Sequence, residues 1–254
     1  MSSYAVILKD PAAPLAAAVP FLAGLKGQGR DPAAAFARAN PGFLGRSLPL
    51  EAARALASGA AAAGFKTIIA AETDLPAPPP ELAAVKIEPG DGGFHARTPG
   101  ALTFIPYETV TIFSAAAWDA AYIPDTLQAL KPGLFARIAA LAGAGLPPPA
   151  APVRETCFRA DIIGGEVPLR VVLRPEALDF SPLGPARGPS SLENFRALLE
   201  LLAAPCFQAV KNDFLPAFLA GRQLAGLKVA SEEAAGLELS RLLLAPRGGA
   251  FPAP

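Results

Sequence analysis

Two short runs of β-branched and aliphatic residues and three segments with helical spacing of apolar residues fill the first 73 positions. The runs YAVILK (residues 4–9) and KTIIAA (66–71) predict strands. Helices are expected at residues 15–25, at 31–40, and from Leu50, where Ala53, Leu56 and Ala60 recur on one face. The predicted order is therefore β-α-α-α-β.

Polar and small residues mark where these helices begin and end. Asp31 before Pro32 is expected to start the second helix, and Ser47 is expected to cap the third. Gly27 and Gly29 fall between the first two helices and predict a helix–helix turn.

Residues 82–119 contain short apolar runs separated by turn residues. Strands are expected at 84–88, 94–97, 101–105 and 108–113, joined by turns such as PGDGG and TPG. Four short strands in succession predict an antiparallel meander, and Trp118 is expected to anchor it as a buried aromatic. The pattern resembles small bacterial domains related to pleckstrin homology.

After a bridging helix expected at 127–142, residues 153–246 predict a hairpin followed by helices. Strands 155–163 and 167–174 flank the turn signal Gly164-Gly165-Glu166. In the second strand the aliphatic side chains share one face, and Arg170 and Arg174 share the other, which we expect to be wet.

Three helices are expected after this hairpin. The first spans 192–203 behind the capping pair Ser190-Ser191, the second spans 207–219, and the third runs from Ser231 to about residue 244.

Two proline-rich stretches divide the chain. Residues 74–81 (DLPAPPPE) and 143–152 (GAGLPPPAAP) predict extended linkers, because successive prolines fix φ and remove hydrogen-bond donors. The expected domains are 1–73, 82–119 and 153–246, followed by a disordered tail at 247–254. The fold class is mixed α+β, with a β-α-α-α-β unit, a β meander, and a β-hairpin packed with three helices.

Residues 27–69 carry a resemblance to a known family. They combine the Gly27-Gln28-Gly29 turn, a short helix ending near Ala39, a helix reading LEAARAL and the Ala62-Ala63-Gly64 exit into a strand. This segment resembles the C-terminal domain of the bacterial ribosomal stalk protein, which implies a small α/β fold of that kind in a bacterial protein. The family's surface for translation factors is lysine-rich. Here the corresponding helix has one internal basic residue, Arg38, so binding of translation factors is not expected.

Charge and hydropathy narrow the function classes. Lys plus Arg and Asp plus Glu number 22 each, and no basic run occurs, so nucleic acid is not an expected partner. The chain is 52% hydrophobic, but no stretch reaches the roughly 18–20 apolar residues of a membrane span. No secretory signal is recognised at residues 1–10, so a cytoplasmic protein is expected.

The chain offers few residues for proton-transfer or metal chemistry. His95 is the one histidine, and Cys157 and Cys206 lie far apart, outside any CxxC motif. We interpret the cysteines as small core residues and His95 as a strand residue. No metal or cofactor is expected.

One loop has the composition of an anion site. Residues 184–194 form a Gly/Pro-rich segment that leads to a helix N-terminus, where free amides favour anions. The candidate ligand-binding residues are Arg187, Ser190, Ser191 and Asn194, and a plain capped loop is the alternative interpretation.

Three functions remain open from the sequence. The favoured one is a non-enzymatic interaction or scaffold protein with protein partners, given small domains and missing catalytic groups. The second is a small-molecule or anion sensor that uses the 184–194 loop. The third is an enzyme that relies on carboxylates alone, with Glu176 and Asp179 as its acids. Glu88 with Asp91 and Glu232 with Glu233 are expected to serve a turn and a helix start.

Overall fold

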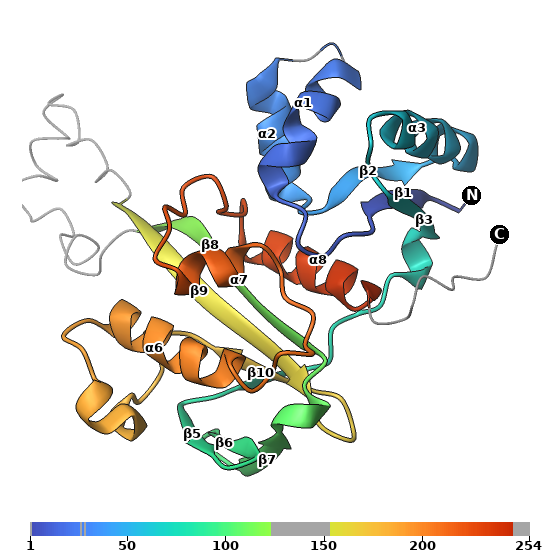
Figure 1. Cartoon of the computed structure of the whole chain (residues 1–254). Coiled ribbons are helices and arrows are strands. Elements are labelled where there is room, and N and C mark those ends of the chain that lie inside the picture. The colour runs from blue at the N-terminus through green and yellow to red at the C-terminus, as the bar shows by residue number, and fades with distance from the viewer. Residues whose placement is uncertain (1, 26, 28, 123–152, 246–254) are drawn as a thin grey trace, which may run out of the picture. The chain divides into compact units, whose positions relative to one another are not determined.

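The computed structural model describes residues 2–25, 27, 29–122 and 153–245 (Figure 1). One compact unit contains Met1–Trp118 and resumes at Phe158, and a second contains Asp119–Cys157. The predicted helix at 127–142, the linker at 143–152 and the tail at 247–254 lie outside the described residues. The fold is mixed α+β, as predicted.

The N-terminal part is a three-stranded antiparallel sheet with three helices. Its strand order is β2-β1-β3, and the chain order is β-α-α-β-α-β. The elements are β1 (Tyr4–Leu8), α1 (Leu15–Leu25), α2 (Arg30–Ala39), β2 (Phe43–Leu48), α3 (Leu50–Ala62) and β3 (Thr67–Ala71). The prediction β-α-α-α-β was wrong because it missed β2, whose sequence FLGRSL lacks a strand's regular alternation.

Two predicted helix caps are also corrected. Asp31 lies inside the first turn of α2 and does not cap it. The residue before that helix is Gly29, which has no side chain to serve as a cap. Ser47 belongs to β2 with φ of 54°, and Pro49 is the residue before α3. The Ser47 amide instead donates to Glu72 Oε1 at 2.8 Å, which ties β2 to the end of β3.

A four-stranded sheet forms the centre of the remaining chain. Its order is β4-β10-β9-β8, with β4 parallel to β10 and β10 antiparallel to β9. The strands are β4 (Glu81–Ala83), β8 (Ile112–Tyr122), β9 (Val153–Gly164) and β10 (Leu169–Leu173). The β9–β10 hairpin was predicted, whereas β4 follows directly on a proline run that was expected to be only a linker.

The meander is smaller than expected. It has three antiparallel strands in the order β5-β6-β7, namely β5 (Lys86–Gly90), β6 (Gly93–Arg97) and β7 (Leu102–Pro106). The fourth predicted strand, 108–113, is divided between a short 3₁₀ turn, η2 (Tyr107–Thr109), and the start of β8. Trp118 therefore lies within β8, where it is buried.

Three C-terminal helices complete the described chain. They are α6 (Ser191–Ala203), α7 (Phe214–Leu219) and α8 (Glu232–Leu242). Ser231 caps α8 as expected, by accepting from the Ala234 amide. Ser190 alone caps α6, and the predicted helix 207–219 is reduced to α7.

The largest hydrophobic core lies on one face of the β4-β10-β9-β8 sheet. Strand residues such as Phe113, Ile162 and Val171 meet α6, α7 and the small β5-β6-β7 sheet there. Figure 1 shows α6 and α7 on the near side of β9. Full burial of each large aliphatic or aromatic side chain contributes about 1.5–3 kcal/mol, so this cluster dominates the packing energy of the unit.

Helix α8 packs between the four-stranded sheet and the N-terminal sheet. Leu239 and Leu242 contact Ile112 and Ile163 on the remaining face of the four-stranded sheet. Leu237 and Leu244 belong to the hydrophobic cluster on one face of the N-terminal sheet. Helices α1, α2 and α3 cover the opposite face of that sheet. In this position α8 buries polar side chains, namely Glu238, Ser240 and Arg241, as well as its leucines.

In the part of the chain that the structure describes, we find no helix long and apolar enough to span a bilayer.

Candidate interaction surface

Three loops meet where β8 begins. The Thr111 amide donates to the carbonyl of Ile163 in β9 at 2.8 Å. On the other side the Phe113 amide donates to the Val210 carbonyl and the Val210 amide donates to the Thr111 carbonyl, both at 2.9 Å. The start of β8 is thus held between the end of the β9–β10 hairpin and the chain that follows α6. Residues 107–109 (η2), the hairpin turn 165–168 and the loop 204–208 consequently lie next to one another; we call them the three-loop surface.

Side-chain hydrogen bonds fix these loops to η2. Thr109 Oγ1 accepts from the Gly165 amide at 2.9 Å and donates to the Pro106 carbonyl at 2.8 Å. The Gln208 side-chain amide donates to the Tyr107 carbonyl at 2.8 Å. Gly165 has φ of 97°, a conformation that favours glycine, so the hairpin turn has a specific backbone requirement. The surface is therefore built from tethered loops.

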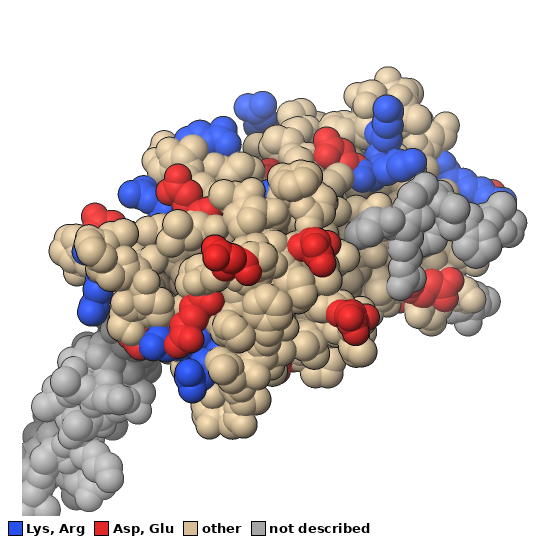
Figure 2. Space-filling view, turned by 60° about the horizontal axis from the view of Figure 1, so that its bottom comes forward, with Lys and Arg blue, Asp and Glu red and all other residues tan. Residues whose placement is uncertain are grey.

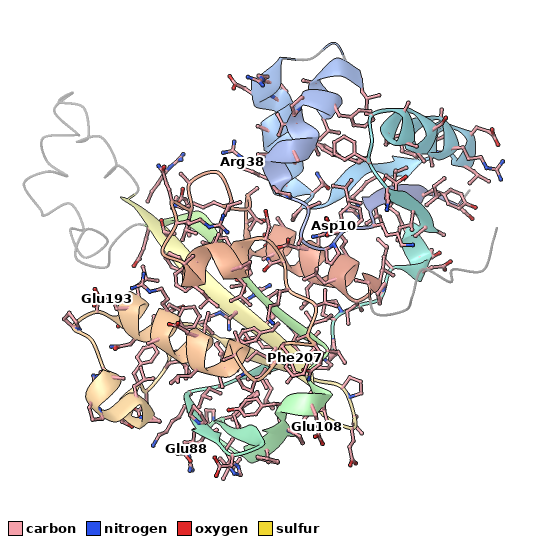
Figure 3. All side chains as sticks on the ribbon, viewed as in Figure 1. Asp10, Arg38, Glu88, Glu108, Glu193 and Phe207 are labelled. Atoms are coloured by element: carbon pink, nitrogen blue, oxygen red, sulfur yellow. The ribbon has the colours of Figure 1, made fainter. Side chains whose placement is uncertain are left out.

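The two most exposed large hydrophobic side chains in the described chain belong to this surface. Phe207 is 84% exposed and Val167 is 74% exposed, and they project from different loops. Figure 3 shows Phe207 beside the loop that carries Glu108. Exposed aromatic and aliphatic side chains on tethered loops are typical anchors for a protein partner, because their burial releases water at little entropic cost.

Acidic side chains accompany these anchors. Glu108 and Glu166 are exposed, and neither forms an ion pair with another residue of the described chain. Figure 2 brings the lower elements of Figure 1 forward. Over the middle of that face acidic side chains stand singly among uncharged ones, and Lys and Arg lie toward its margins. The three-loop surface therefore combines apolar anchors with negative charge that no described residue pairs.

The predicted anion loop is built around the Asn194 side chain. Asn194 is buried; its Oδ1 accepts from the Gly188 amide at 2.6 Å and its Nδ2 donates to the Gly188 carbonyl at 3.2 Å. Ser190 Oγ accepts from the Glu193 amide, and Arg187 and Ser191 are exposed. These contacts hold the loop on the N-terminus of α6 and already use Ser190 and Asn194. Anion binding at this loop stays a prediction.

The arginine-bearing face of β10 is not wet, contrary to expectation. Asp161 accepts from Arg159 Nε at 2.9 Å and from Arg170 Nε at 2.7 Å, and the Arg159 side chain is only 3% exposed. Its guanidinium also lies over the Trp118 ring at 5.8 Å. α8 covers this face and supplies Glu232, which accepts from Arg159 at 3.0 Å. The partners come from distant segments, so the strand pattern alone did not reveal them.

This ion network continues to the edge strand β4. Arg174 donates to Glu232 at 2.8 Å and also pairs with Glu81. Its hydrogen bonds hold the pKa values of both glutamates below their ordinary value, against a smaller opposing effect of burial. Three arginines and three carboxylates balance, which supports a structural role for the network.

We expect these two pKa shifts to make the protein less stable in acid. A lowered folded-state pKa contributes stability that is present above the ordinary glutamate pKa and is lost as pH falls through the folded-state value. Replacing Arg174 with glutamine should flatten the dependence of the unfolding free energy on pH between about pH 3 and pH 5. Urea unfolding at several pH values measures this dependence. An unchanged slope would show that Arg174 is not its source.

The other sequence candidates do not converge. His95 lies in β6 with its ring 4.9 Å from that of Phe104, and Glu176 and Asp179 are exposed. The Asp179 carboxylate accepts from Ser181, so these two acids do not line a closed cleft. Among the residues that the structure describes, no group of three or more His, Cys, Asp or Glu is placed to hold a metal ion.

Neither Cys157 nor Cys206 forms a disulfide in the described chain. Cys206 is buried as predicted, and burial raises its pKa to about 11, which leaves it a poor nucleophile. Cys157 is only partly buried, so the prediction of a core position was wrong for it.

Sequence reasoning missed the three-loop surface because it placed Phe207 inside a helix. The Asn212 side chain instead exchanges hydrogen bonds with the backbone of Ala115, at 2.7 and 3.2 Å. This contact holds the segment before Asn212 next to β8, so that segment does not continue as a helix. Pro205 and the run Lys211-Asn212-Asp213 were the signals in the sequence against a continuous helix.

We compared the chain with family models, with curated proteins and with solved structures, and none of the three comparisons gave a match. The resemblances to the ribosomal stalk domain and to pleckstrin homology domains stay predictions.

Proposed function

We propose that this protein is a non-enzymatic interaction module that binds a partner protein through the three-loop surface. The observation that carries the proposal is the joint exposure of Phe207 and Val167 on tethered loops, next to two carboxylates that have no ion-pair partner among the described residues. The absence of a metal cluster among the described residues is compatible with this role but does not carry it.

The chemistry of the surface defines the partner. Phe207 is 84% exposed, so an apolar side chain of the partner would be favoured in contact with it. Glu108 and Glu166 favour Lys or Arg of the partner at the edge of the contact. The partner is therefore a segment of another protein in which an apolar residue lies next to basic ones. A purely acidic segment would be repelled.

Selection from a random peptide library displayed on phage, with the whole chain as bait, tests this proposal. We expect enriched peptides to contain an aromatic or aliphatic residue flanked by Lys or Arg. Their binding should fall at least tenfold, or about 1.4 kcal/mol, when Phe207 is replaced by serine. Phe104→Ser on β7 is the matched control, because that ring is also exposed, at 48%, but lies on the small sheet.

Two outcomes would contradict the proposal. One is a selection that yields no consensus from the whole chain. The other is a consensus peptide whose affinity is insensitive to Phe207→Ser but is lost with Phe104→Ser, which would move the interaction to the β5-β6-β7 sheet.

A further inference from the structure

A pocket lies between α1, α2 and the loop before α8. It encloses about 290 Å³, close to the lower end of the range for small-molecule pockets. Its lining comes from two parts of the chain that are far apart in sequence: Ala16, Val19, Pro20, Arg30, Ala34, Ala37, Arg38, Ala225 and Gly226.

The pocket is hollow because its side chains are small. Ala34 and Ala37 share the face of α2 that looks toward Val19 and Pro20 on α1, and none of them reaches across the space. The loop that closes the pocket is fixed on both sides. The Ala230 amide donates to the Arg38 carbonyl at 2.9 Å, and the Val229 amide donates to Ala117 at 3.0 Å.

Charge at this pocket has one sign. Arg30 and Arg38 are its charged lining residues, and no carboxylate is among the residues that line it. Neither arginine forms an ion pair with another residue of the described chain. They lie eight residues apart on α2, which places both on the side of the helix that faces the pocket. Figure 3 shows Arg38 at the end of α2 near the loop that precedes α8.

We propose that this pocket binds a small apolar carboxylate, such as a medium-chain fatty acid, with its tail among the alanines and its carboxylate on Arg38 or Arg30. An apolar lining favours a hydrocarbon tail, and a guanidinium at the mouth favours a carboxylate through charge-assisted hydrogen bonds. This site is separate from the three-loop surface and does not rest on the proposed protein partner.

Decanoate, decylamine and acetate, each below the concentration at which it forms micelles, are the probes for this site. Isothermal titration and thermal unfolding of the whole chain should show saturable binding and stabilisation by decanoate. Decylamine, with the same tail and the opposite charge, and acetate, with the head alone, should bind at least tenfold more weakly. Equal affinity for decylamine, or no saturable decanoate binding, would overturn the proposal.

Two variants test the site from independent directions. Arg38→Glu reverses the charge at the mouth, and Gly226→Leu adds a large apolar side chain to a lining residue, at a position where an added Cβ meets no heavy atom within 4 Å. Each is expected to weaken decanoate binding at least tenfold. Arg54→Glu on α3 is the control, because that arginine is exposed and pairs with Glu51 away from the pocket. A loss with Arg54→Glu as large as with Arg38→Glu would also overturn the proposal.

Circular dichroism of each variant separates loss of binding from loss of folding. If one variant does not fold, the other still decides the outcome, since they act on different parts of the site.

Discussion

Replacing Asp161 with alanine is expected to lower the free energy of unfolding by about 3–5 kcal/mol, because it removes one partner from a buried ion network. Asp161 is the carboxylate shared by Arg159 and Arg170, and the side chains of Arg159 and Asp161 are 3% and 4% exposed. The variant leaves Arg159 with Glu232 as its one anionic partner among the described residues. Arg159 Nη2 already has no hydrogen-bond partner among the described residues, so Nη2 does not compensate for the contact with Asp161 that the variant loses.

Urea unfolding at neutral pH measures this loss, with Glu51→Ala as the control. Glu51 pairs with Arg54 on the surface of α3, and loss of such an exposed pair costs about 0.5 kcal/mol or less. A triple variant with Arg159→Met, Asp161→Leu and Arg170→Met removes the charges together and should recover much of the loss. If Asp161→Ala costs no more than Glu51→Ala, the network does not hold the structure together.

Replacing Arg241 with alanine is expected to cost a similar amount, about 3–5 kcal/mol, because this buried arginine joins α8 to the N-terminal part. Its side chain is 3% exposed and donates to the carbonyls of Asp10 and Pro11 at 3.0 and 2.9 Å. Arg241 Nη2 also lies 3.5 Å from Glu238 Oε1. Burial raises the pKa of Glu238, and the positive charge of Arg241 opposes this rise. Without Arg241 the pKa of Glu238 in the folded protein is higher still, so the loss of stability should grow as pH rises above the ordinary glutamate pKa.

Gly42 offers an independent way to break the same contact. A Cβ at this position would overlap the Arg241 side chain, and φ of 78° disfavours any other residue. Gly42→Ala should therefore destabilise the protein, and combining it with Arg241→Ala should cost less than the sum of the two changes. Strict additivity would show that Gly42 and Arg241 do not act through one contact.

The sequence predicted elements whose signals are local. Helix α1 has the predicted bounds of residues 15–25, Ser231 caps α8, and the hairpin turn at 165–168 between β9 and β10 begins within the predicted signal Gly164-Gly165-Glu166. Each depends on residues close in the chain, where capping, turn chemistry and periodicity act directly.

Features that depend on distant partners were missed. β4 has three residues and is defined by its parallel pairing with β10, almost 90 positions later. The face of β10 with Arg170 and Arg174 was predicted to be exposed to solvent. The prediction failed because the acidic partners of these arginines come from three other elements, as Asp161, Glu81 and Glu232. The candidate surface was missed for the same reason, since Asn212 fixes its loop through Ala115. The hydrophobic periodicity of a single segment does not reveal contacts between distant segments.

The most direct measurement for the proposed interaction is the affinity of one selected peptide for the whole chain, by fluorescence anisotropy, at low and high salt. We predict at least a tenfold loss with Phe207→Ser, and with Glu108→Lys a weaker affinity that depends less on salt. Phe104→Ser and Asp31→Lys should leave both quantities unchanged. A peptide that binds Phe207→Ser and Glu108→Lys as tightly as the unaltered chain would contradict binding at the three-loop surface.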